Sequence, residues 1–471
     1  MPGDKLGRIL FAIIIIQEEK VMIRKKTEVI LTMVVLGLCD WSMAAPLISN
    51  VRMQQRQNSR IVDVWYDLAD EDAIVTLGVE TNGVAIPASA VTHVSGDVGV
   101  VVSVGSNKRI VWLAGADWPD NQTASAKARI TAWSTNSPPM YLVVDLEGGV
   151  ASGSFPFKYY EEEGALPDGG LTNAVYRCSR IVLRRIRTGA PWPEDGLFLS
   201  GSNHRETGRY ATREDQHFVR LTKDYYMAVF ETTQGQWLRV MGSNPSFYQN
   251  HPDCWETRPV ERVSWRHIRM SADNSWNGVA KWPENAPSVG PGSFMAVLRD
   301  KTGLNSFDLP TEMQWEYACR AGTTRALYFG GGVGYNLTNA TADAELTDKL
   351  RYQYNGGQDN PSGTPTYWPD DVDGSLATAV VGSYTPNPWG LYDMLGNVFE
   401  LCLDNYIGSL GYECVVDPVG IPTPPDSDRQ HTRKGGSIAI SAAGCRSAYR
   451  GGITDTGAII DTGFRIVLNL N

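Results

Sequence analysis

The sequence predicts an α+β fold in two parts: an all-β sandwich near the N-terminus and a larger domain with little regular secondary structure. With 471 residues the chain is longer than one hydrophobic core usually fills, so two or three domains are expected. Between residues 48 and 133, short stretches alternate apolar and polar residues between clusters of Asp, Gly, Asn and Pro, which predicts strands. From about residue 176 the chain is dense in Trp, Gly and Pro, with helical stretches among irregular loops.

Composition and charge narrow the class of protein. Apolar residues make up 42% of the chain and charged residues 20%, which is typical of folded globular domains. The formal net charge is -10, and no basic run follows the start of the chain. Nucleic acid is therefore not expected as a partner.

Residues 1–45 have the pattern of a secretory signal peptide. Basic residues at 24–26 precede an apolar core, Val29 to Cys39, that is too short to span a bilayer, and small residues at 44–45 suit cleavage. We therefore expect an exported protein, periplasmic, at the cell surface or secreted, with no membrane span. Residues 1–21 either belong to this leader or follow a start codon that was assigned too early.

Residues 46–135 are expected to form the β-sandwich. Strands are predicted at 61–66, 74–79, 98–104 and 109–112, and their spacing resembles a fibronectin type III-like module. Residues 136–175 are interpreted as a linker, because they are rich in Pro, Gly and Ser and carry one apolar strand, Tyr141 to Val144, and an acidic patch, Glu161 to Glu163. Residues 176–471 form the α+β domain.

Two helices are predicted within that domain. Thr311 to Cys319 follows Pro310 and places Met313 and Trp315 for burial, which indicates a short capped helix. Val263 to Met270 is the second stretch with helical character.

Six motifs of the larger domain occur in an order that resembles a known family. They are Tyr226 to Gln234, Arg258 to Trp265, Leu309 to Ala318, Pro386 to Glu400, Gly435-Gly436-Ser437 and Gly463-Phe464-Arg465. Together they resemble the formylglycine-generating enzymes, also called sulfatase-modifying factor proteins, over about the last 290 residues. The resemblance implies a variant of the C-type-lectin-like fold.

The resemblance also implies where catalysis would take place. Family members that oxidise a sulfatase cysteine to formylglycine bind Cu(I) between two cysteines five positions apart, and paired thiolates favour this soft ion. Here the second position is Cys445, but the first is Ile440, which cannot bind a metal. Cu(I) is therefore not expected. Cys445 and Ser437 are the candidate catalytic residues; the alternatives are a structural thiol and a turn serine.

Calcium is the metal that the resemblance favours, because the family carries structural Ca²⁺ sites built from carboxylates and backbone carbonyls. The first site would use Asp393, the carbonyls of Gly396 and Val398, and Glu400. The second would use Asp373, the carbonyl of Ser375, and Asn355. The alternative for Asp393 and Glu400 is hydrogen bonding within their own loop.

Two functions follow from these observations. The first is a binding or display module, a pseudoenzyme that holds a peptide, protein or glycan on the C-terminal loop surface formed by Ile438 to Gly444 and Gly451 to Thr462. The second is an active oxidoreductase that converts a sulfatase cysteine to formylglycine. Arg446 and Arg450 are expected to hold loop carbonyls or carboxylates.

The cysteines leave one question open. Six of them follow the signal segment, and an exported protein permits disulfides, although buried free thiols are equally compatible with this count. These are Cys178, Cys254, Cys319, Cys402, Cys414 and Cys445.

Overall fold

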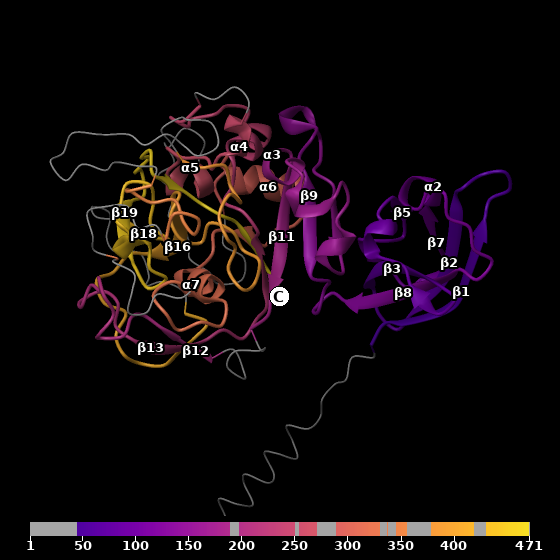
Figure 1. Ribbon diagram of the computed structural model, residues 1–471, viewed down its shortest axis with the longest axis horizontal. Coiled ribbons are helices and arrows are strands. Elements are labelled where there is room, and N and C mark those ends of the chain that lie inside the picture. Colours follow the sequence, from indigo (N-terminus) through magenta and orange to yellow (C-terminus); the bar gives the residue numbers. More distant parts are fainter. Residues whose placement is uncertain are drawn as a thin grey trace, which may run out of the picture.

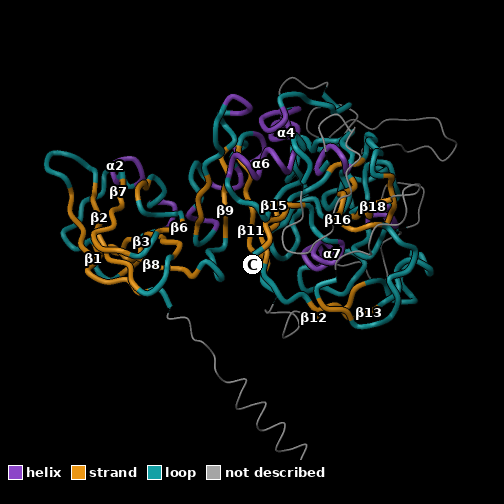
Figure 2. The backbone as a smooth tube through the Cα atoms, turned by 180° about the vertical axis from the view of Figure 1, so that it is seen from behind, coloured by secondary structure: helices purple, strands orange, loops and turns teal. Residues whose placement is uncertain are grey.

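The computed structural model describes residues 45–188, 197–249, 254–270, 289–329, 337, 345–355, 378–418 and 430–470. Two bodies lie side by side, a smaller β-rich one and a larger one with the short helices (Figures 1 and 2). No helix within these ranges is long and apolar enough to cross a bilayer. The predicted signal segment, residues 1–44, lies outside the described residues.

The smaller body consists of two packed sheets. One has the strand order β1-β2-β7-β5; the other has β4-β3-β6, with β8 also paired to β3. Their bounds are β1 Leu47–Gln55, β2 Val62–Ala69, β3 Ala73–Thr81, β4 Val84–Ala85, β5 Val94–Gly96, β6 Val101–Val102, β7 Gly105–Trp112 and β8 Lys127–Ser134, with the short helix α2 at Ala114–Asp117. Side chains such as Val64, Tyr66 and Ile110 fill the space between the sheets. Strands therefore form at all four predicted places.

Residues 136–175 differ from the predicted linker. They contribute β9 (Tyr141–Asp145) and β10 (Phe157–Tyr160) to the main sheet of the larger body. Tyr141 and Val143 pack into one hydrophobic cluster, whereas Leu142 and Val144 pack into another. The apolar run is therefore a strand that is covered on both faces, and such a run does not alternate in polarity.

The main sheet joins segments that are far apart in the sequence. Its order is β10-β9-β11-β14-β21-β15, and every neighbouring pair is antiparallel. The remaining bounds are β11 Arg180–Ile186, β14 Tyr225–Ala228, β15 Phe307–Asp308 and β21 Val467–Asn469. The last strand lies between β14 and β15, so the C-terminal Gly463-Phe464-Arg465 motif enters the centre of the domain.

Five short α-helices lie in the described part of the larger body, and a Ser or Thr side chain caps each of them except the first. They are α3 Val175–Cys178, α4 Gln234–Met241, α5 Trp265–Arg269, α6 Phe294–Thr302 and α7 Glu312–Arg320. The two predicted helices are confirmed as α5 and α7. Thr311 caps α7 in a capping box with Gln314, and Ser264 caps α5 in the same way with His267.

Two small sheets complete the larger body. One is β12-β13-β17, with bounds Leu197–Ser200, His217–Arg220 and Val415–Val416. The other is β19-β18-β16-β20, with bounds Gly451–Thr454, Gln430–Lys434, Phe399–Asn405 and Thr462–Gly463. Strands β18 and β19 flank the segment from Gly435 to Arg450, so this sheet positions the candidate catalytic residues.

Candidate functional site

The Gly-Gly-Ser turn lies directly against Cys445. Gly435 has φ 90° and Gly436 has φ 79°, a backbone conformation that side chains other than glycine rarely adopt. A Cβ at Gly436 would lie 2.5 Å from the Cys445 sulfur and 2.7 Å from its Cα. Two glycines are therefore required for the chain to turn beneath this cysteine.

Ser437 is held by its neighbours. Its hydroxyl donates to Asp461 Oδ2 at 2.9 Å and accepts from the Ala439 amide at 3.2 Å, and the residue is fully buried. Asp461 also pairs with Arg433, at 3.5 Å. The hydroxyl thus closes a turn, and no local pattern could identify Asp461 because that residue lies 24 positions away.

Cys445 is a buried thiol. Loss of solvent raises its pKa to about 12, so the thiol keeps its proton at neutral pH. Ile440 packs against Gly444, where an added Cβ would lie 2.3 Å from its Cδ1. The residue at the predicted first copper position therefore lies beside Cys445, as an apolar packing group.

Two other thiols, those of Cys319 and Cys402, share the hydrophobic cluster of Cys445. Cys319, on α7, donates to the Ser447 hydroxyl at 3.5 Å and faces the Met394 carbonyl at 3.7 Å; burial raises its pKa to about 12. No disulfide joins Cys178, Cys319, Cys402, Cys414 or Cys445. For these five cysteines the structure supports the free-thiol alternative.

The cations around Cys445 are paired with carboxylates. Arg446 contacts Glu214 and Glu206, each at 2.7 Å, and also donates to the Gly208 carbonyl at 2.6 Å. Arg450 makes a bidentate pair with Glu312, and Lys434 contacts Glu316 at 3.0 Å. The predicted structural role of Arg446 and Arg450 is confirmed.

The first predicted calcium site falls in a second buried cluster, which we call the acid cluster: Glu231, Asp393, Glu400 and Arg465. Asn397 donates to Glu231 at 2.6 Å, and the Val398 amide donates to the same carboxylate at 3.2 Å. Burial, followed by the charges of Asp393 and Glu400, raises the pKa of Glu231 well above its usual range. Glu231 lies more than 150 residues before Asp393, so the spacing within the 386–400 motif could not identify it.

One carboxylate oxygen of Asp393 has no hydrogen-bond partner among the described residues. Its Oδ2 accepts from the Gly382 amide at 2.6 Å, whereas its Oδ1 is buried and has no hydrogen-bond partner within the described part of the chain. Burial raises the pKa of Asp393 to about 6, although the Gly382 amide and Arg465 act in the opposite direction. An unpartnered buried oxygen of this kind fits a bound cation or a retained proton.

Two of the other predicted calcium ligands, Glu400 and Asn355, are already held by hydrogen bonds within the protein. Both Glu400 oxygens accept from Arg465, at 2.6 Å each, and one also accepts from the Trp315 indole. The Asn355 amide is held in its own turn by the Tyr352 amide and the Leu350 carbonyl, at 2.8 and 2.7 Å. Asp373 and Ser375 lie outside the described residues. In the described ranges, no three His, Cys, Asp or Glu side chains are arranged to hold a metal.

The predicted ligand surface is only partly exposed. In Ile438 to Gly444, Ala439 is the one residue that is exposed, and Ile438 is 4% exposed. The second segment exposes Thr454 and Thr456, together with Ile459 at 41% and Ile460 at 43%. The surface is therefore narrower than predicted and centres on residues 454–460.

This chain is similar to several known proteins. The chaperone protein LppX of Paenibacillus barcinonensis is 27% identical over 275 residues, which span 56% of this chain and 87% of that protein. The formylglycine-generating enzyme of Thermomonospora curvata is 33% identical over 162 residues, or 33% of this chain and 48% of the enzyme. Among solved structures, Treponema denticola variable protein 1 matches with a TM-score of 0.42 and 24% identity, covering 61% of this chain and 95% of that one.

The match to a protein family lies in the larger body. Residues 192–470, more than half of the chain, match the sulfatase-modifying factor enzyme 1-like domain. The match includes the Gly-Gly-Ser turn, Cys445 and all four members of the acid cluster. This chain belongs to the sulfatase-modifying factor enzyme 1-like family.

Proposed function

We propose that this chain is a non-oxidising member of its family that binds a peptide, protein or glycan through residues 454–460. The observation that carries the proposal is that Ile440 stands five positions before Cys445, where the copper-binding members of the family have a second thiol. A single buried thiol with a raised pKa is a poor soft-metal ligand, because the thiolate is the form that binds. Ser437 is fully buried with its hydroxyl bonded to Asp461, so a substrate at the surface does not reach it.

The exposed residues support binding. Ile459 and Ile460 are large apolar side chains at the surface, and exposed apolar groups on a rigid frame are typical of interaction sites. The frame beside them is fixed by Arg266, which contacts Asp455 at 2.9 Å. One relative is named a chaperone protein, which favours a peptide or protein as the ligand.

The proposal has three accompanying parts. We infer the C-type-lectin-like variant of the fold, since the last strand enters the main sheet between β14 and β15. We also propose export, from the pattern of residues 22–45. Calcium is proposed only for Asp393 with the carbonyls of Gly396 and Val398, since Glu400 is paired with Arg465.

An assay of peptide oxidation tests the loss of catalysis. The purified protein is incubated with Cu(I), oxygen and a Cys-x-Pro-x-Arg peptide, and the peptide mass is followed. We expect an unchanged cysteine. Conversion of its CH₂–SH group to an aldehyde would establish the alternative, an active formylglycine-generating oxidoreductase.

A binding array tests the surface. Wild-type protein is applied to arrays of peptides and glycans beside an Ile459→Ser/Ile460→Ser variant and a control, Val416→Ser, which alters an exposed apolar residue on β17. We expect ligands that bind wild type and the control but not the double variant. Equal binding by all three proteins, or no ligand at all, would contradict the proposed surface.

A further inference from the structure

A cavity of about 300 Å³ lies where the β-sandwich meets the larger body. The chain crosses this junction with direct contacts: the Tyr159 amide donates to the Gly99 carbonyl at 2.7 Å, and the Thr76 hydroxyl donates to Glu161 at 3.4 Å. The cavity is thus built by two parts of the fold rather than by a loop. Small-molecule sites occur preferentially at such domain interfaces, and this volume is at the small end of their range.

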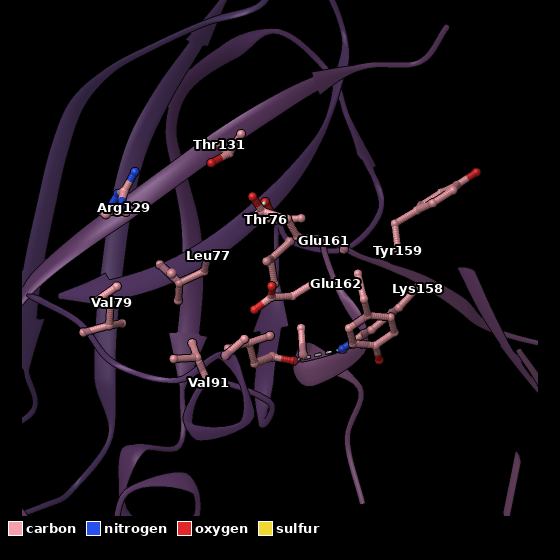
Figure 3. Close-up of a pocket in the computed structure, with 18 of the residues that line it drawn as sticks. Thr76, Leu77, Val79, Val91, Arg129, Thr131, Lys158, Tyr159, Glu161 and Glu162 are labelled. Atoms are coloured by element: carbon pink, nitrogen blue, oxygen red, sulfur yellow. Dashed lines mark hydrogen bonds between the residues drawn. The ribbon is translucent and has the colours of Figure 1, made fainter. Parts of the chain in front are cut away.

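The two walls differ in chemistry. The sandwich supplies apolar side chains, among them Leu77, Val79 and Val91. Across from them in Figure 3 lie Glu161 and Glu162, which follow β10. An apolar wall facing two adjacent carboxylates is complementary to a molecule with an apolar body and a positive group.

Two cations also line the cavity, and within the described residues neither forms an ion pair with Glu161 or Glu162. The Lys158 ammonium donates to the Val94 carbonyl at 2.9 Å, shown as the dashed line in Figure 3, and burial lowers its pKa. Arg129 lies on β8 with its side chain exposed at the edge of the sandwich. The Glu162 carboxylate, which is exposed like that of Glu161, makes no hydrogen bond or ion pair with any described residue, so it is available to a ligand.

We propose that this junction cavity binds a small organic cation, an apolar group bearing one ammonium, with Glu161 and Glu162 as its counter-charges. The site is separate from the ligand surface at residues 454–460 and does not depend on it. A bound cation would contact both bodies and so stabilise their junction.

Three probes that share a phenylethyl group differ in the charge of the group it carries. Protonated 2-phenylethylamine, neutral 2-phenylethanol and anionic 3-phenylpropionate are titrated into the full chain by calorimetry. We expect the amine to bind about two- to fivefold more tightly than the alcohol, the range for an exposed charge interaction, and the acid to bind most weakly.

Variants of the three neighbouring glutamates test which carboxylates cause the preference for the amine. Glu161→Gln/Glu162→Gln is expected to lose the preference for the amine, whereas Glu163→Gln keeps it, because Glu163 accepts from the Tyr141 hydroxyl and does not line the cavity. Glu162→Gln alone should lose part of it, and this variant removes no hydrogen bond within the fold. The proposal is overturned if the amine does not bind, if the alcohol or acid binds as tightly, or if the double variant keeps the preference.

Discussion

The two buried charge clusters of the larger body differ in how their charges balance. Around Cys445, four cations face four carboxylates: Lys434, Arg320, Arg446 and Arg450 against Glu206, Glu214, Glu312 and Glu316. In the acid cluster, three carboxylates surround one arginine, Arg465. The balanced network satisfies itself and holds the fold, whereas the acid cluster needs protons or a cation. We therefore infer that Cys445 lies in a structural frame and that the acid cluster responds to pH and to cations.

The largest effect should come from breaking the balanced network. Arg446→Met leaves Glu214 buried without its partner, and breaking a buried ion pair on one side costs about 3–5 kcal/mol of unfolding free energy. Urea denaturation measures the loss. The control, Arg205→Met, alters an exposed side chain and should stay within about 0.5 kcal/mol of wild type. A small loss in Arg446→Met would mean that the network does not hold this segment.

A second change tests the contact beneath Cys445. Gly436→Ala places a methyl group against the sulfur and forces a side chain into the left-handed region, so we expect a loss of about 2–4 kcal/mol. Gly169→Ala is the matched control, because Gly169 has φ 83° but nothing within 4 Å of an added Cβ. It should lose only the backbone contribution, about 1 kcal/mol. Equal losses would show that contact with Cys445 is not what requires a glycine.

The acid cluster should make stability depend on pH. The pKa of Asp393 is raised from 3.8 to about 6, so the folded state binds more protons than the unfolded state between these values. Stability contributed by this group is therefore present below pH 4 and lost as pH rises to about 6, by roughly 3 kcal/mol. Melting curves in EDTA should show the decline in wild type and a flatter profile in Asp393→Asn. The exposed-site control, Asp120→Asn, should follow wild type.

Calcium would reverse the sign of that slope. A bound cation keeps the carboxylates ionised, so stability in millimolar Ca²⁺ should rise with pH instead of falling. If the profile is the same in Ca²⁺ and in EDTA, the acid cluster keeps protons and holds no stabilising calcium.

Local patterns predicted the parts of the fold that depend on local chemistry. The cap of α7 and the alternation of β2 and β3 could be read directly, because each lies within about ten residues. The predicted linker failed for a related reason: Tyr141 to Val144 is apolar on both faces, and alternation cannot show which sheet such a run joins.

The sequence alone could not show which residues far along the chain form hydrogen bonds or ion pairs with the motif residues. The motif gave Asp393 and Glu400, but Glu231 joins them only because Asn397 and the Val398 amide bridge to it. Likewise, Ser437 could be located, whereas its partner Asp461 could not. Pairing of Glu400 with Arg465 is what changes the expected calcium site, and a spacing of four motif positions contains no information about that arginine.

The most direct test of the central claim is a Cu(I) competition titration against a chromogenic chelator. Wild type should take no copper from the chelator, because Cys445 is a single protonated thiol beside Ile440. Ile440→Cys, which restores two thiols five positions apart, should compete. Competition by wild type at a level similar to the variant would contradict the account of Cys445 as a structural residue.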